Sequence, residues 1–155
     1  MCAAADPGNA FVMRRTAARA WVNDGGDIAW YLAAQRSLRV GLFADLSRLD
    51  ADQILHGIRS DGQLDLTYDM PVRGVATSGW RGRSFSRGIA DSVTVLARTA
   101  AEADAAATVI ANAVDVSDAR IVRKPACELK DDSDLGAIAV TVDVPPLGAE
   151  VTRRA

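Results

Sequence analysis

Residues 73–114 read RGVATSGWRGRSFSRGIADSVTVLARTAAEADAAATVIANAV, and this stretch decides how the rest of the chain is interpreted. Val72–Ala76 and Ser92–Ala97 are short apolar runs that predict buried strands, and the segment between them is rich in glycine, serine and arginine. Thr99–Val114 is dominated by alanine, which favours a helix. Two strands, an arginine-bearing turn and a helix are therefore expected to follow one another closely.

A capping box marks the start of this helix. Thr99 is followed three residues later by Glu102, so a hydroxyl and a carboxylate can satisfy amide groups that the first helical turn leaves unpaired. Glu102 is thereby explained without a role in a site. The small alanine side chains let the helix approach a sheet closely, and Val109 and Ile110 supply larger apolar contacts.

Upstream of this stretch, apolar and alternating patterns predict further strands. They cover Ala20–Asn23, Asp27–Ala33, Leu38–Phe43 and Gln63–Tyr68. The sequence Asp24-Gly25-Gly26 between the first two is typical of a hairpin turn. Helices are expected over Asn9–Arg19 and Asp50–Ile58.

The C-terminal part predicts one more strand, Ile138–Val144, after which Pro145-Pro146 ends regular structure before a polar tail, residues 145–155. The succession of elements predicts the α+β class: a single domain, residues 1–155, with a mixed, mostly antiparallel sheet and helices packed on it.

Composition narrows the classes of partner. The 155 residues are 49% hydrophobic, which suits one domain with an aliphatic core. Eighteen basic and twenty acidic residues give a formal charge of -2, so we expect no nucleic-acid partner. No apolar stretch approaches the roughly 18 residues of a spanning helix, so we also expect no membrane association.

Cysteine usage indicates a reducing compartment. Cys2 and Cys127 lie far apart without a C-x-x-C spacing, which argues against a zinc knuckle or a redox pair. Both are expected to be free thiols, and the protein is expected to be cytoplasmic.

Asp104 and Thr108 are the candidate metal ligands. They are four residues apart, so on a helix they project from one face, and Asn112 extends the same stripe by another turn. A carboxylate and a hydroxyl are suitable oxygen ligands for Mg²⁺, which keeps waters and recruits phosphate oxygens. The alternative is a solvated polar stripe on an amphipathic helix, and the spacing alone favours that alternative.

Gly79–Gly88 is the candidate anion-binding segment, with three arginines, two serines and three glycines. Glycines let backbone amides approach an anion, and arginine binds phosphate through two parallel hydrogen bonds. The segment matches neither a Walker loop nor a dinucleotide fingerprint, and an ordinary surface loop explains it equally well. His56 lies outside all of these segments and is interpreted as a surface or partly buried helix residue.

Four motifs occur in a fixed order along the chain. They are Val22–Ile28 (VNDGGDI), Ala76–Gly79 (ATSG), Asp91–Ala97 (DSVTVLA) and Ala103–Thr108 (ADAAAT). Together they resemble the ApbE superfamily of flavin transferases, formerly called thiamine biosynthesis lipoproteins. Gly82–Asp91 is most similar to the uncharacterised cytoplasmic ApbE-like branch of that superfamily.

The resemblance implies a cofactor and a reaction. Such enzymes bind FAD and magnesium and transfer the FMN moiety of FAD to a protein threonine or serine, releasing AMP, whereas some hydrolyse FAD to FMN and AMP. A magnesium-dependent FAD:protein FMN transferase with an acceptor flavoprotein, or an FAD pyrophosphatase, is therefore expected. The alternative is a non-catalytic flavin- or nucleotide-binding or structural subunit that needs a partner to complete its site.

The resemblance also assigns roles residue by residue. It makes Asp104 and Thr108 the ligands of Mg²⁺. It makes the flavin nucleotide the neighbour of Gly25, Gly26, Asp27, Thr77, Ser78 and Gly79. Arg83 and Ser84, from the candidate anion-binding segment, are added to these as expected cofactor-binding residues. The resemblance assigns no catalytic residue.

Two departures from the transferase pattern add an expectation. The transferases carry a His-x-x-Asp-Pro segment where this chain has Arg83-Ser84-Phe85-Ser86, and they carry a substantial segment before the Gly-Gly-Asp-Ile motif. We therefore expect the chain to be the C-terminal portion of the full family domain. A second copy or a partner chain is expected to complete the pocket.

Overall fold

The computed structural model describes residues 17–43 and 60–155, and its N-terminal unit is a hairpin. Strands β1 (Arg19–Asp24) and β2 (Asp27–Leu32) pair antiparallel across a two-residue turn. Gly25 and Gly26 both have positive φ, +67° and +116°, as a tight primed turn requires. The Gly26 amide donates to Asn23 Oδ1 at 2.9 Å, which fixes the turn further.

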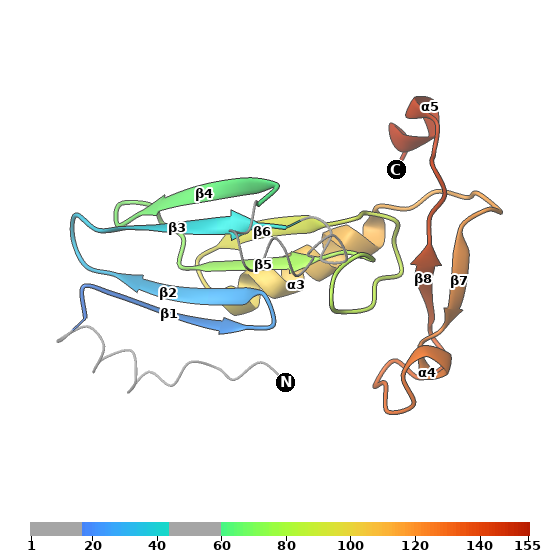
Figure 1. The fold of residues 1–155 in the computed structure, drawn as a ribbon, viewed down its shortest axis with the longest axis horizontal. Coiled ribbons are helices and arrows are strands. Elements are labelled where there is room, and N and C mark those ends of the chain that lie inside the picture. The colour runs from blue at the N-terminus through green and yellow to red at the C-terminus, as the bar shows by residue number, and fades with distance from the viewer. Residues whose placement is uncertain (1–16, 44–59) are drawn as a thin grey trace, which may run out of the picture.

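This hairpin forms half of the largest sheet. Strand β2 pairs antiparallel with β5 (Gly74–Ser78), which pairs antiparallel with β6 (Val93–Ala97), giving the order β1-β2-β5-β6. Strands β3 (Ser37–Leu42) and β4 (Gly62–Thr67) form a separate hairpin that lies over this sheet (Figure 1).

Helix α3 (Ala100–Ala113) packs along β5 and β6 on the other side of the sheet (Figure 1). The threonine half of the predicted capping box is confirmed, because the Glu102 amide donates to Thr99 Oγ1 at 3.1 Å. Such a cap contributes about 1 kcal/mol. The Glu102 carboxylate forms an ion pair with Arg98 at 3.1 Å.

The two faces of β5 connect these layers. Successive strand residues point to opposite faces, so Val75 joins the core beneath β3–β4 and Ala76 joins the core beneath α3. The first core contains Trp30, Leu32, Val40, Leu66 and Val75. The second contains Ala76, Ala103 and Ala107. Val95 and Ala97 of β6 pack against these alanines, so α3 meets the sheet mainly through alanine side chains.

Glycines permit the closest backbone contacts of α3. A Cβ on Gly74 would lie 2.1 Å from the Ala100 nitrogen, at the start of the helix. A Cβ on Gly88 would lie 1.9 Å from the carbonyl oxygen of Ala111 and 2.7 Å from that of Val114, at its end. Neither position has room for a side chain.

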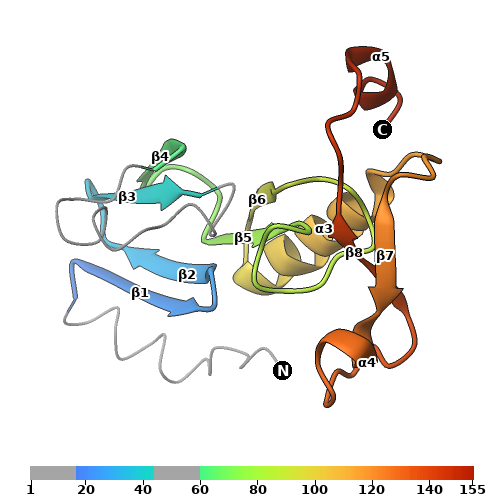
Figure 2. The same cartoon turned by 45° about the vertical axis from the view of Figure 1, so that its right-hand side comes forward.

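The C-terminal part forms a third antiparallel pair, β7 (Val122–Pro125) and β8 (Ala139–Asp143). This hairpin lies beyond the C-terminal end of α3 in both views (Figures 1 and 2). Two single-turn helices, α4 (Ala126–Leu129) and α5 (Ala149–Thr152), complete the described elements.

The α+β fold prediction is confirmed, and every strand pair among the described residues is antiparallel. Three details are corrected: β7 and α4 were not predicted, and α5 interrupts the segment expected to be an irregular tail. The helix predicted for Asp50–Ile58 lies outside the described residues. So does most of that predicted for Asn9–Arg19, whose last residue begins β1.

The close packing of α3 against the sheet leads to a stability prediction. We expect Ala107→Leu to lower the free energy of unfolding by about 1–3 kcal/mol. Ala107 is fully buried on the side of α3 that faces the sheet, so there is no space for three more carbons. The matched control is Ala105→Leu on the exposed side of the same helix, which should change it by less than about 0.5 kcal/mol. Urea unfolding of both variants compares them, and equal effects would contradict this packing.

Candidate functional site

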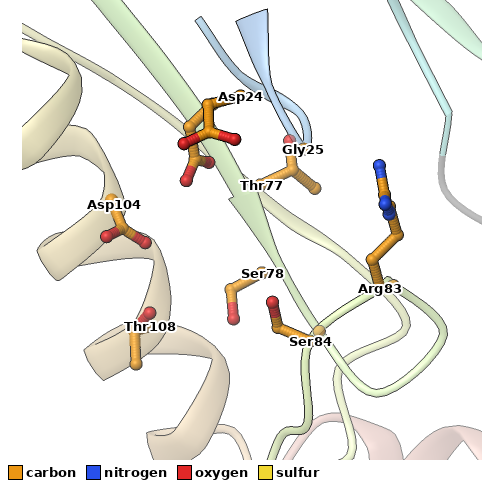
Figure 3. Close-up of a pocket in the computed structure, with 11 residues that line it drawn as sticks. Asp24, Gly25, Thr77, Ser78, Arg83, Ser84, Asp104 and Thr108 are labelled. Carbon is orange, nitrogen blue, oxygen red and sulfur yellow. The ribbon is translucent and has the colours of Figure 1, made fainter. Parts of the chain in front are cut away.

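A pocket of about 290 Å³ lies where the β1–β2 turn, the end of β5, the following loop and α3 meet. Its walls are polar, and Figure 3 shows the side chains of Ser78, Ser84, Asp104 and Thr108 directed toward a common space. The lining residues are Asp24, Gly25, Asp27, Thr77, Ser78, Gly79, Gly82, Arg83, Ser84, Asp104 and Thr108.

The helix contributes Asp104 and Thr108, which lie one turn apart on its pocket side. Asp104 is half-buried and Thr108 is exposed at the rim. They can stand close to the sheet because Ala103 and Ala107, the residues preceding each of them, are fully buried against it. The small helix face thus brings a carboxylate and a hydroxyl up to the end of β5.

Asp27, at the start of β2, is the electrostatic centre of the pocket. Burial raises the pKa of its carboxyl, and the nearby carboxylates of Asp104 and Asp24 raise it further. A hydrogen bond from the Thr77 backbone amide opposes these effects without cancelling them. Carboxylates from two other elements, Asp24 on β1 and Asp104 on α3, therefore disfavour the charged form of Asp27 on β2.

Such an arrangement suits a hard divalent cation that is only partly held by protein. No group of three His, Cys, Asp or Glu side chains in residues 17–43 and 60–155 is arranged to hold a metal by itself. Carboxylate and hydroxyl oxygens from this pocket could supply some ligands, with waters and phosphate oxygens filling the remainder, as Mg²⁺ prefers.

The loop after β5 is anchored at its start. Gly79 has a φ of +145°, and a Cβ there would lie 2.4 Å from the Asp91 carbonyl oxygen. The Asp91 carboxylate accepts hydrogen bonds from Trp80 Nε1 at 2.9 Å and Arg81 Nε at 3.0 Å. Arg81 also stacks over the Trp80 ring, 4.5 Å from its centroid.

Arg83 has a different environment from Arg81. It lines the pocket and is exposed, and none of the hydrogen bonds or ion pairs within the described part of the chain involves its side chain. Figure 3 shows it apart from α3, on the loop side. An exposed guanidinium is a group that can bind an anion through two parallel hydrogen bonds.

A second pocket of about 220 Å³ adjoins the first and is more apolar. The two share Gly25, Thr77, Ser78, Gly82 and Arg83. Its apolar walls are Ile28 and Val75 from the sheet, and Val40, Leu42 and Phe43 from β3 and the residue after it. A polar pocket and a more apolar one thus lie side by side, with Arg83 among the residues that border both.

The structure brings most of the sequence-predicted site residues together. Nine of the ten line the first pocket: Gly25, Asp27, Thr77, Ser78, Gly79, Arg83, Ser84, Asp104 and Thr108. Gly26 lines the second. What these residues bind stays a prediction.

Sequence reasoning missed two lining residues. Asp24 and Gly82 line the pocket, although Asp24 was interpreted only as part of the turn signal. Its position across the Gly25-Gly26 turn from Asp27, with which it pairs, was an available signal, because both strand ends adjoin one turn. His56 lies outside the described residues.

These features define an α+β protein with a carboxylate- and hydroxyl-lined pocket at the end of a central strand. Comparison with known proteins supplies the family: the model described as AbpE bacteria matches residues 3–155. The chain therefore belongs to the AbpE bacteria family.

The chain is also similar to proteins named UPF0280 protein from methanogenic archaea. It is 37% identical over 124 residues to one from Methanopyrus kandleri, covering 78% of this chain and 46% of that protein. It is 40% identical over 112 residues to one from Methanothermobacter thermautotrophicus, covering 72% and 39% respectively. The chain spans less than half the length of these relatives. No solved structure matches it significantly.

These findings correct the family assignment made from the sequence. The resemblance to the ApbE flavin transferases was wrong as a classification, because the matching family is AbpE bacteria and the matched relatives carry only the name UPF0280 protein. The four motifs consist mainly of glycine, alanine, serine and threonine around a few acidic residues. Such residues also serve tight turns and close helix packing, so their order did not distinguish the two families.

The carboxylate crowding around Asp27 gives a pH-dependent prediction. Because its pKa is raised in the folded protein, ionised Asp27 destabilises the fold at neutral pH, and this penalty shrinks as the pH falls toward the ordinary carboxyl range. Asp27→Asn should therefore raise the melting temperature at pH 7, with a smaller gain in acid. Thermal unfolding without divalent cations measures this.

The control for this prediction is Asp69→Asn, an exposed position outside both pockets. It should show no comparable gain at pH 7. A gain from Asp27→Asn that is the same at every pH, or a loss at neutral pH, would contradict the electrostatic account.

Proposed function

We propose that the pocket binds a phosphate-bearing nucleotide together with a divalent cation. The observation that carries this proposal is the convergence of Asp24, Asp27 and Asp104 on one pocket, where burial raises the pKa of Asp27 and repulsion from the other two carboxylates raises it further. A divalent cation relieves that repulsion. It also supplies the positive charge to which phosphate oxygens bind.

The other side of the pocket favours an anion. Arg83 offers a guanidinium and Ser84 a hydroxyl, and Gly79 and Gly82 allow the backbone to approach a ligand closely. Carboxylates on one wall and these groups on the other fit a phosphate that bridges a cation and an arginine.

The adjoining apolar pocket favours a nucleotide over inorganic phosphate. Val40, Leu42 and Phe43 provide the kind of surface on which a base or another flat ring is buried, and Arg83 stands between this surface and the polar pocket. A ligand with a ring at one end and phosphates at the other matches both parts.

FAD and Mg²⁺ were the cofactors predicted from the sequence, and they remain the first ligands to test. FAD combines flat rings with a diphosphate. When bound, Mg²⁺ would neutralise diphosphate charge and orient the phosphorus for attack, so cleavage to AMP is a natural second activity of such a site. Binding without cleavage is the simpler function, and it needs only the residues described above.

Two further expectations belong to the same proposal. A second copy or a partner protein would enclose the exposed rim at Thr108. A cytoplasmic location agrees with the exposed free thiol of Cys127. No helix in the described ranges is long and apolar enough to cross a bilayer.

The cation dependence of binding tests the proposal. We expect wild-type protein to retain FAD or ADP more tightly with Mg²⁺ than with EDTA in equilibrium dialysis. Asp104→Asn should weaken the Mg²⁺-dependent affinity about tenfold or more, because a charged ligand is lost. Asp143→Asn, outside both pockets, is the control. Affinity that is indifferent to Mg²⁺ would overturn the cation part, and no retention of either nucleotide would overturn the whole.

Chromatography of the same mixtures separates binding from chemistry. Intact FAD after incubation indicates binding alone, AMP with free FMN indicates hydrolysis, and AMP with protein-bound flavin indicates transfer. Any AMP released by the pocket should disappear in Asp104→Asn.

Arg83 provides an independent prediction for the phosphate. Arg83→Gln should weaken ADP binding roughly 10- to 100-fold, as expected for loss of a charged hydrogen bond. The affinity of the same variant for adenosine, which lacks phosphate, should change little. Arg36→Gln, at an exposed position outside both pockets, is the control. Equal losses for ADP and adenosine in calorimetry would argue against an Arg83–phosphate contact.

A further inference from the structure

Ser86 and Thr141 are the two polar side chains that are fully buried in the described part of the chain, with 2% and 4% of their surface exposed. They come from different elements, the loop after β5 and strand β8. Both nevertheless contact the same short backbone segment, residues 86–88. Neither lines the pockets.

Asn112, from the last turn of α3, holds this segment from one side. Its Oδ1 accepts the Arg87 backbone amide at 2.8 Å and the Ser86 hydroxyl at 3.3 Å. The Ser86 oxygen in turn accepts the Gly88 amide at 3.2 Å. One side-chain oxygen of the helix thereby organises two consecutive loop residues.

The β7–β8 hairpin holds the segment from the other side. The Thr141 amide donates to the Ser86 carbonyl at 2.8 Å, and its hydroxyl donates to the Arg87 carbonyl at 3.1 Å. Arg123 Nε on β7 reaches the same Arg87 carbonyl at 3.3 Å, and the Arg123 guanidinium pairs with Asp115.

Backbone packing leaves the segment little freedom. Gly88 lies so close to the end of α3 that a Cβ would be 1.9 Å from the Ala111 carbonyl oxygen. The next residue, Ile89, is buried and donates its amide to the Val114 carbonyl at 2.8 Å. The loop base is therefore fixed against the helix end by hydrogen bonds and by close contact.

Ser84 and Arg83 line the pocket only two and three residues before this fixed base. We propose that Asn112 and Thr141 are positioning residues that hold residues 86–88 so that Ser84 and Arg83 face the ligand. Loop order before binding removes an entropic cost from the binding step. The inference rests on the proposed function, and it gives the β7–β8 hairpin a part in binding although neither of its strands lines the pocket.

Matched variants separate positioning from general stability. Asn112→Leu keeps similar size but removes the acceptor, whereas Asn112→Asp keeps an acceptor oxygen for both donors. Thr141→Val removes the hydroxyl from the hairpin side and serves if Asn112→Leu does not fold. Leu32→Val, in the core beneath β3–β4 and outside both pockets, weakens the fold without touching the loop.

Two measurements on the full chain decide the matter. By hydrogen exchange, the Arg87 and Gly88 amides of Asn112→Leu should exchange at least about tenfold faster, while α3 amides that pack on the sheet keep their rates. By calorimetry with Mg²⁺, the same variant should bind ADP about tenfold more weakly. Asn112→Asp should show wild-type exchange rates and wild-type ADP affinity. Leu32→Val should neither speed exchange at Arg87 and Gly88 in particular nor weaken ADP binding.

The outcomes distinguish this inference from the proposed function. Unchanged ADP affinity in Asn112→Leu and Thr141→Val, with wild type binding ADP, would overturn positioning alone. If Leu32→Val lost as much ADP affinity as Asn112→Leu, the loss would reflect general destabilisation of the fold and not positioning. If the wild type binds no nucleotide, the proposed function fails, and the positioning of a ligand fails with it. Faster exchange of the Arg87 amide in Asn112→Leu would then show only that Asn112 holds residues 86–88 in place.

Discussion

The alternation of side chains along β5 is the constraint on which the other layers depend. Val75 enters the core beneath the β3–β4 hairpin and Ala76 enters the core beneath α3, so one strand belongs to both. The same strand then continues into Thr77 and Ser78, which leave the two cores and line the pocket. A shift of one residue in the pairing of β5 would exchange the two faces and remove the pocket wall at the same time.

The pocket follows from the small residues on either side of this strand. Alanines on the sheet side of α3 bring Asp104 close enough for its carboxylate to raise the pKa of Asp27. The Gly25-Gly26 turn brings Asp24 to the same place from the other direction. The protein thus holds like charges together in the folded chain, and the proposed cation site rests on that arrangement.

The sequence predicted what local patterns control. The primed turn, the helix cap and the large-sheet strands each depend on residues near one another, and these predictions were confirmed, although β5 begins and ends two residues later than expected. β7 was missed because Val122–Pro125 shows no clear alternation and is defined by its pairing with β8. The candidate site was found from motif order, but its second, apolar part needs β3 beside β5, a contact that no local pattern specifies.

The family assignment shows a different limit of sequence reasoning, since small residues and turns serve many ligands equally well. Geometry adds a relation that composition lacks. Gly74 lies under the first residue of α3 and Gly88 lies under its last turn, each in backbone contact with no space to spare. Close backbone contacts therefore hold the helix at both ends. It can neither slide along its axis nor lift from the sheet without breaking one of these contacts. The number of residues between the Gly74 contact at Ala100 and the two polar side chains then sets where Asp104 and Thr108 stand along the strand. A deletion between Ala100 and Asp104 would turn both side chains away from the pocket even if the helix itself survived.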